Sequence, residues 1–140
     1  MSTEKQNIEK IGMICSGSWQ SKRKVRDLIF KIKQRVENFE LVSIGNGGAD
    51  GMVKKFALEM ECNYKEFNPA YTNRNLYSAC HSNYYGKPFS NKYLFQRNGM
   101  YSKYIDKLVV FWDGESVLGN NIMDIIRSVE KLNKSVVIIN

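Results

Sequence analysis

The sequence is poor in the residues that build disulfide scaffolds and metal sites. It contains three cysteines and one histidine in 140 residues. Cys15, Cys62 and Cys80 are widely spaced, odd in number and form no CxxC pair, so we expect reduced thiols in a reducing compartment. His81 has no second cysteine or histidine at ligand spacing apart from the adjacent Cys80. No metal site and no cofactor are therefore predicted.

Long apolar runs are absent as well. No stretch of about 18 apolar residues occurs, so neither a membrane-spanning helix nor a membrane partner is expected. Residues 1–9 are polar, lack the apolar core of a secretory signal, and are expected to be flexible. No internal repeat or linker divides the chain, and its length suits one domain with its own core. We therefore expect a single cytoplasmic domain spanning residues 1–140.

Short apolar runs alternate with segments of helical spacing. The strands are expected at residues 10–16, 40–44, 62–67, 107–112 and 135–139, the last of them buried like the others. The helices are expected at residues 21–36, 52–60, 92–104 and 122–132. This order predicts an α/β fold of the Rossmann-like, doubly wound type, with a mainly parallel sheet of about five strands.

Three of the strand-to-helix turns have an unusual composition. They are Ser16-Gly17-Ser18-Trp19, the glycine-rich turn from Gly45 to Gly51, and the turn from Trp112 to Asn120. Right-handed crossovers bring such turns to the carboxyl edge of the sheet, where open α/β sheets bind ligands. Glycines allow close approach of a ligand, and the amides that start the next helix bind anions. Neither a Walker A motif nor the GxGxxG dinucleotide fingerprint is present, so NAD-dependent dehydrogenase chemistry is not indicated.

The motifs occur in a characteristic order along the chain. They are Ser16-Gly17, Gly47-Gly48-Ala49-Asp50, Tyr85-Gly86-Lys87, Arg97-Asn98-Gly99-Met100, Phe111-Trp112-Asp113-Gly114-Glu115-Ser116 and Gly119-Asn120. With this combination the chain, from about residue 10 to 139, resembles the SLOG superfamily of Rossmann-like proteins, and in particular its small bacterial and phage members. That superfamily includes the LOG (lysine-decarboxylase-like) phosphoribohydrolases and the DNA-processing protein A. The resemblance implies a nucleotide or nucleotide-derived ligand.

The turns and the resemblance together predict a set of ligand-binding residues. Asp50 is expected either to hold a ribose hydroxyl or to cap the following helix. Arg97 is expected to bind phosphate or ribose, its alternative being a surface position on a helix. The full set is Ser16, Gly17, Ser18, Trp19, Gly45, Gly47, Gly48, Asp50, Lys87, Arg97, Asn98, Asp113, Gly114, Ser116, Gly119 and Asn120.

The sequence departs from the LOG pattern where the catalytic acid belongs. Ile122 and Met123 occupy the positions at which LOG enzymes carry their glutamate, with only Asp124 nearby. Asn120 replaces the usual threonine, and the segment between Lys87 and Arg97 is longer than usual, which suggests a remodelled lid. The candidate catalytic residues are then Asp113 and Glu115, for which turn formation and helix initiation are the alternative roles.

Charge and aromatic residues gather in two further segments. The net charge is +7, and residues 22–35 contain seven of the basic side chains, which form either a solvated helix face or a polyanion-binding surface. Residues 70–91 contain four tyrosines and no clear period. This long loop could stack nucleobases or pack as a lid over the sheet edge.

Three functions follow from these observations. The first is a sensor or sequestering protein that binds a nucleotide-derived small molecule without turnover. The second is an enzyme of the nucleotide phosphoribohydrolase or deoxyribosyltransferase type, which cleaves an N-glycosidic bond with Glu115, Asp113 or Asp124. The third is single-stranded nucleic-acid binding through the basic helix and the tyrosine-rich loop. The apolar helix faces also permit a homodimer or a higher homo-oligomer.

Overall fold

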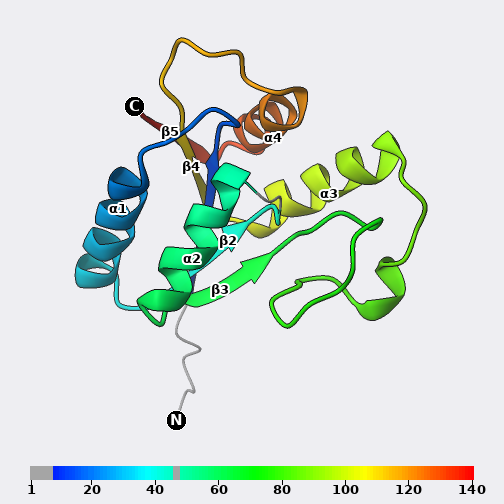
Figure 1. Cartoon of the computed structure of the whole chain (residues 1–140), viewed down its shortest axis with the longest axis horizontal. Helices are drawn as coiled ribbons and strands as arrows, with labels where there is room; N and C mark the ends of the chain where they lie inside the picture. Colours follow the sequence, from blue (N-terminus) through cyan, green and yellow to red (C-terminus); the bar gives the residue numbers. More distant parts are fainter. Residues whose placement is uncertain (1–7, 46–47) are drawn as a thin grey trace.

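The computed structural model describes residues 8–45 and 48–140, and its core is one parallel sheet (Figure 1). The strand order is β3-β2-β1-β4-β5, and every neighbouring pair is parallel. The strands are β1 (Glu9–Cys15), β2 (Phe39–Ser43), β3 (Asn63–Glu66), β4 (Lys107–Phe111) and β5 (Ser135–Ile139). The predicted single-domain, Rossmann-like α/β fold is confirmed.

Helices cover both faces of this sheet. One face packs against α1 and α2, and the opposite face packs against α3 and α4 (Figure 1). The helices are α1 (Lys22–Arg35), α2 (Gly51–Glu59), α3 (Asn91–Tyr104) and α4 (Asn120–Lys131), with short 3-10 turns η1 (Gly48–Asp50) and η2 (Ser82–Tyr84). Residues 1–7 lie outside the described residues, and Glu9, predicted to belong to a flexible N-terminus, is already part of β1.

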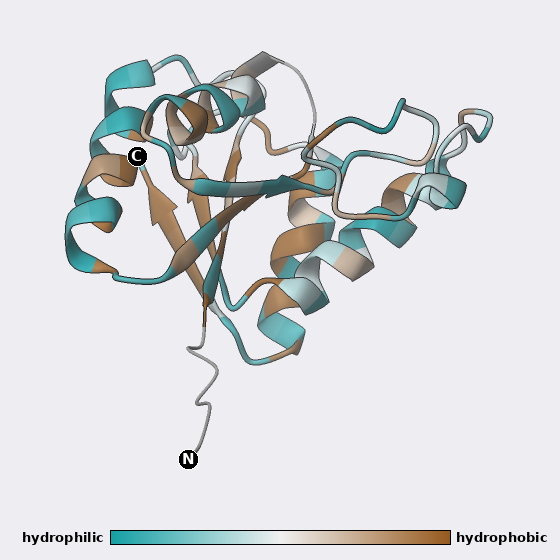
Figure 2. Cartoon of the chain, turned by 90° about the horizontal axis from the view of Figure 1, so that it is seen from below, coloured by the Kyte–Doolittle hydropathy of each residue, from teal (hydrophilic) through white to brown (hydrophobic). Residues whose placement is uncertain are grey.

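The central strand β1 explains why the helices pack on both sides. Ile11 and Met13 point toward α1 and α2, whereas Ile14 points toward α3 and α4, and all three are fully buried. Strands buried on both faces are near-continuously apolar, as the hydropathy colouring in Figure 2 shows for the central strands, whereas the edge strand β3 is hydrophilic. Successive strand residues therefore serve two separate cores.

The last strand, β5, differs from its prediction. It was expected to be buried, but Val137 and Ile138 are 44% and 43% exposed. The reason is position: β5 pairs only with β4 and forms the edge of the sheet. An apolar run alone does not distinguish a central strand from an edge strand, because the neighbours of the strand decide its burial.

Among the described residues, no helix is long and apolar enough to cross a membrane.

Candidate functional site

A cleft of about 650 Å³ lies at the carboxyl edge of the sheet. It forms where the chain order changes direction, with β1 between β2 and β4. Such a switch point is the usual ligand site of open α/β sheets. Its lining comes from all three turns singled out in the sequence: Cys15, Gly17, Ser18, Ile44, Ala49, Asp50, Ser116, Val117, Gly119, Asn120, Asn121 and Ile122. The topology thus brings together turns that are about 100 residues apart in the sequence.

The turn after β1 is held tightly by the backbone. The Ser16 amide donates to the Phe111 carbonyl at 2.9 Å, and the Ser16 carbonyl accepts from the Trp19 amide at 3.0 Å. Gly17 and Ser18 are exposed and line the cleft. The Ser16 hydroxyl is buried and has no hydrogen-bond partner among the described residues. The turn therefore offers Gly17 and Ser18 to a ligand, whereas Ser16 does not line the cleft.

Trp19 belongs to the core and not to the cleft. It is 8% exposed, its ring centroid lies 5.5 Å from that of Phe111, and its indole N–H donates to the Ser21 carbonyl at 3.0 Å. It lines a separate, shallower depression of about 460 Å³, which Ser18 and Lys24 also line. A tryptophan with a satisfied N–H and a packed ring has little surface left for stacking on a base.

The glycine-rich turn after β2 combines a packing requirement with a polar residue. Gly45 has a φ of +67°, and a Cβ there would lie 2.6 Å from the Asn68 Cβ, so only glycine fits. Gly47 lies outside the described residues. Gly48 begins η1, which leads through Asp50 directly into α2. Gly45 lines a smaller cavity of about 150 Å³ next to the cleft, and Asp50 lines both cavities.

Asp50 is a buried acid whose carboxylate points across to β1. It is 7% exposed, makes no side-chain cap to α2, and accepts a 2.8 Å hydrogen bond from the Cys15 amide. Burial raises the pKa of Asp50 to about 6, against the smaller opposing effects of the Cys15 amide and the Arg97 charge. Of the two predicted roles, helix capping is wrong. Asp50 presents a carboxyl group that changes charge close to neutral pH.

The turn after β4 is organised by Asp113, one of the predicted catalytic acids. Its Oδ1 accepts from the Glu115 amide at 2.9 Å, the Ser116 amide at 2.8 Å and the Ser116 hydroxyl at 2.9 Å. These bonds lower the pKa of Asp113, which is fully exposed. Gly114 supplies the positive φ of +82° that the turn requires. Asp113 lines the shallower depression and Glu115 lines neither cavity, whereas the predicted residues Ser116, Gly119 and Asn120 of this turn reach the cleft.

The start of α4 forms one wall of the cleft. Gly119 is the N-cap residue, and it provides no side chain to satisfy the first amides of the helix. Gly119, Asn120, Asn121 and Ile122 all line the cleft. The first turn of an α-helix has amides without intrahelical partners and a partial positive charge. This wall is therefore suited to an anionic group such as phosphate.

Arg97 and Asn98 support this wall from behind, and neither lines the cleft. Both are fully buried. The Arg97 guanidinium donates to the carbonyls of Ile44 at 2.7 Å and Phe67 at 3.3 Å, and to the Asn98 Oδ1 at 2.8 Å. The expected surface alternative for Arg97 is wrong. Arg97 joins the carboxyl ends of β2 and β3, and burial lowers its pKa.

Asn98 links Arg97 to helix α4 through hydrogen bonds. Its Nδ2 donates to the Asn121 Oδ1 at 3.3 Å and to the Asp124 Oδ2 at 3.1 Å. Asn121 is itself a cleft residue. Asp124, the acid nearest to the LOG glutamate position, therefore accepts from Asn98 and does not line the cleft. One Arg97 nitrogen, Nη2, is buried without a partner among the described residues.

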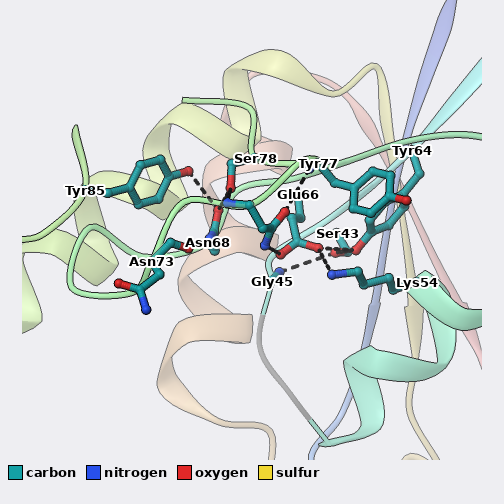
Figure 3. A network of polar contacts seen from close by, with 11 residues as sticks. Ser43, Gly45, Lys54, Tyr64, Glu66, Asn68, Asn73, Tyr77, Ser78 and Tyr85 are labelled. Atoms are coloured by element: carbon teal, nitrogen blue, oxygen red, sulfur yellow. Dashed lines mark hydrogen bonds and ion pairs between the residues drawn. The ribbon is translucent and has the colours of Figure 1, made fainter. Parts of the chain in front are cut away.

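The end of β3 carries a polar network that the sequence pattern did not reveal (Figure 3). Glu66 is 4% exposed and pairs with the Lys54 ammonium at 3.1 Å. Its carboxylate also accepts hydrogen bonds from the Tyr64 hydroxyl at 3.0 Å and from the side-chain amide of Asn75 at 2.9 Å. The Ser43 and Tyr64 hydroxyls lie 2.6 Å apart. The smaller cavity beside Asp50 is lined by Ser43, Lys54, Tyr64 and Glu66, which were missed because they come from strand and helix positions, not from turns.

The tyrosine-rich segment 70–91 is attached to this network and lies away from the cleft. Asn68 Oδ1 accepts from the hydroxyls of Ser78 at 3.0 Å and Tyr85 at 2.8 Å (Figure 3). No residue of segment 70–91 lines the cleft, and Lys87 is exposed. The segment runs beside α3 on the side of the molecule opposite to α1 (Figure 1). The structure therefore does not place it as a lid over the cleft.

Comparisons with known proteins support the fold. No protein-family model matches the chain, and no curated protein matches its sequence. The structure of TM1055, a structural-genomics target, superposes with a TM-score of 0.63 at 12% identity over 92% of this chain and 72% of its own. Acinetobacter baumannii MurG gives 0.50 at 11% identity over 93% of this chain, which spans only 34% of MurG. At such identities these structures are similar in their Rossmann-like fold alone.

Proposed function

We propose that the chain binds a phosphate-bearing nucleotide or nucleotide-derived ligand in the cleft, as a sensor or sequestering protein of the SLOG type. The observation that carries this proposal is the wall at the start of α4, where Gly119 leaves the first helix amides without a side-chain cap. A phosphate placed there accepts from those amides and gains from the helix dipole. The cleft of about 650 Å³ falls within the usual size range of small-molecule sites.

Binding without turnover is favoured by the positions of the predicted acids. Asp113 is committed to three hydrogen bonds within its own turn, and Glu115 is exposed outside the cleft. A general acid must come within hydrogen-bond reach of the leaving group. Neither residue meets this condition for a ligand whose phosphate contacts α4.

The first test is the identity of any molecule that accompanies the protein. We would heat the purified chain and analyse the released small molecules by mass spectrometry. An intact nucleotide or nucleotide derivative at stoichiometric amount is expected. A chain that carries no nucleotide, and that binds none of a panel of nucleoside mono-, di- and triphosphates in calorimetry, contradicts the proposal.

The second test places a negative charge at the proposed phosphate position. Gly119 has a φ of −63° and open space around a new Cβ, so Gly119→Asp is compatible with the fold. Aspartate is a good N-cap, so the variant should be as stable as the parent or slightly more stable. Nucleotide affinity should fall at least tenfold through charge repulsion. Asn91→Asp, which adds the same charge to the first turn of α3, should keep the parent affinity.

A second candidate function rests on Asp50. This acid lies in the cleft and, with a pKa of about 6, can exchange a proton near neutral pH. In an N-glycosidase, Asp50 would donate its proton to the leaving base as the bond between C1′ of the ribose and the base nitrogen breaks. Water would then form the new C1′–O bond and lose a proton to the Asp50 carboxylate. Release of free base from a nucleoside monophosphate, lost in Asp50→Asn with binding retained, would establish this function. Bound nucleotide that stays intact over a day excludes it.

A further inference from the structure

Helix α1 contains nearly all of the molecule's net charge. It carries seven of the 21 basic side chains and only one of the 14 acidic ones, so six of the seven net positive charges belong to it. The remainder of the chain is close to neutral. A field of this kind, concentrated on one helix, attracts polyanions over a distance of about one Debye length.

The basic side chains of α1 point to solvent and are poorly neutralised. All seven are exposed, whereas Val25 and Ile29 are fully buried on the inner side of the helix. The single acid, Asp27, lies 3.5 Å from Arg23 and 3.4 Å from Arg26. Lys24 and Lys33 donate to backbone carbonyls of Asn140 and Met60. Lys22, Lys31 and Arg35 have no acidic partner among the described residues.

The charges at the start of α1 oppose the stability of the helix, whereas Lys33 and Arg35 in its last turn favour it. The first turn contains Lys22, Arg23 and Lys24 and no acidic residue, although the helix dipole favours anions there. Lys22 with Arg26, and Lys31 with Arg35, are like-charged pairs at i,i+4, each of which destabilises a helix by a few tenths of a kcal/mol. A local arrangement that works against the fold is expected where function requires it.

The helix geometry arranges the cations in two rows. At 3.6 residues per turn, one flank of the helix carries Lys22, Arg26 and Lys33, and the opposite flank carries Lys24, Lys31 and Arg35. Arg23 lies between the two flanks, on the side that faces away from the sheet. Phe30 lies between the rows and is 53% exposed. The 14 residues of α1 extend over about 21 Å. The exposed surface of α1 is therefore a strip with cations along both edges and with Arg23 and one accessible aromatic ring between them.

The chemistry of this strip selects among the polyanions. An anionic membrane is disfavoured because surface helices insert an apolar face, and the apolar face of α1 is buried against the sheet. A polynucleotide offers regularly spaced phosphates for the two rows and bases for Phe30. We propose that the outer face of α1 binds single-stranded nucleic acid, with phosphates on the cations and a base stacked on Phe30. This surface is separate from the nucleotide cleft.

The test measures, by fluorescence anisotropy, the binding of a fluorescein-labelled oligo(dT) of 20 nucleotides to the full chain between 50 and 300 mM salt. The variant Lys22→Gln/Lys31→Gln/Arg35→Gln removes the three cations that have neither an acidic partner nor a backbone carbonyl partner among the described residues. Single-strand affinity falls with a logarithmic salt slope of about −0.7 per phosphate contact. The triple variant should bind at least tenfold more weakly at 50 mM salt, with a slope shallower by about two.

A matched control and a second variant keep the test specific. Lys92→Gln/Lys103→Gln/Lys131→Gln removes the same charge from exposed positions of α3 and α4, on the other side of the sheet, and should keep the parent affinity. Phe30→Ala should weaken oligo(dT) binding about 5- to 100-fold and leave binding of inorganic polyphosphate unchanged, because only bases stack. All variants should keep the parent's melting temperature within a few degrees.

Three results would overturn this inference. They are equal loss of affinity in the control variant, no effect of Phe30→Ala on oligo(dT), and tighter binding to vesicles containing anionic lipid than to oligo(dT). Nucleoside-phosphate affinity, measured on the same variants, should stay at the parent value. The outcome for α1 is thus independent of the outcome for the cleft.

Discussion

At the scale of single residues, the cleft depends on a few side chains with unusual surroundings. Asp50 is an almost fully buried acid with one amide donor, and Arg97 is a fully buried base whose contacts are carbonyls and an amide oxygen. Burial of a charge without a direct counter-ion destabilises the folded state. Residues of this kind are retained where the ligand or the chemistry needs them.

Replacement of Asp50 should reveal this cost as a change in pH dependence. The pKa of Asp50 is raised from 3.8 to about 6 on folding, so its protonated form is stabilised and stability falls as pH rises from about 4 to 6. Two pKa units correspond to about 3 kcal/mol. Asp50→Asn keeps an acceptor for the Cys15 amide. Urea unfolding should show the variant to be more stable than the parent at pH 8 by up to about 3 kcal/mol, and similar at pH 4. Parallel pH profiles would contradict this.

A glycine in the central strand tests the packing between the sheet and α3. A Cβ on Gly12 would lie 2.6 Å from the Tyr101 hydroxyl and 2.7 Å from a methyl group of Ile105. Tyr101 is fully buried and donates to the Val42 carbonyl at 2.8 Å, so it has little room to move. Gly12→Ala should destabilise the fold by about 1–3 kcal/mol through overpacking. Gly17→Ala, where nothing lies within 4 Å, should leave the unfolding midpoint unchanged.

At the scale of secondary-structure elements, the N-termini of α1 and α4 differ in their capping and in the charge of their first turns. α1 is capped by Ser21, whose hydroxyl accepts from the Lys24 amide at 3.3 Å, but its first turn is purely basic. α4 has no side-chain cap, and its first turn faces the cleft. Each helix start thus gives up part of its possible stability, and in each case the missing partner is an anion. The two proposed anionic ligands correspond to these two elements.

A charge reversal in α1 should raise stability while it weakens polynucleotide binding. Lys22→Glu places an acid in the first turn and creates a favourable i,i+4 pair with Arg26, which together should stabilise the fold by about 1 kcal/mol. The reciprocal control is Lys131→Glu in the last turn of α4, which should destabilise by a similar amount. Thermal unfolding at low salt measures both. Lower stability of Lys22→Glu would mean that its ammonium group has a structural partner.

At the scale of the whole molecule, the fold assembles a cleft from three turns that no local contact connects. The strand order places β1 between β2 and β4, so the turns after these strands share one edge. Arg97 and Asn98 then join α3 to the strand ends and to α4. A ligand in the cleft contacts both halves of the sheet and should therefore stabilise the entire cooperative unit.

Ligand binding should raise the melting temperature of the whole domain. A nucleotide at 100 times its dissociation constant stabilises the native state by about 2.7 kcal/mol. For a domain of this size that is an increase of about 8 °C. Scanning fluorimetry with the nucleotide identified by mass spectrometry checks this value. Gly119→Asp should show no such increase at the same concentration, and an equal increase would place the phosphate elsewhere.

The fold was predictable because its signals are local and repeated. Alternation of apolar runs with helical periods specifies parallel strands and crossovers, so the doubly wound fold and the edge at which its turns meet follow from the sequence pattern alone. The turns after β1, β2 and β4 were recognised by their glycines and small polar residues. The residues of these turns that line the cleft include Gly17, Ser18, Asp50, Ser116 and Gly119.

Which polar residues face the cleft depends on contacts between segments that are distant in sequence. Arg97 and Asp113 match the motifs equally well in sequence, yet one is buried behind the wall and the other is exposed beyond it. The direction of a side chain depends on neighbours that are distant in sequence, as the Ile44 and Phe67 carbonyls are for Arg97. The exposure of β5 was decided in the same way, because an edge is defined by a missing neighbour and not by the composition of the strand.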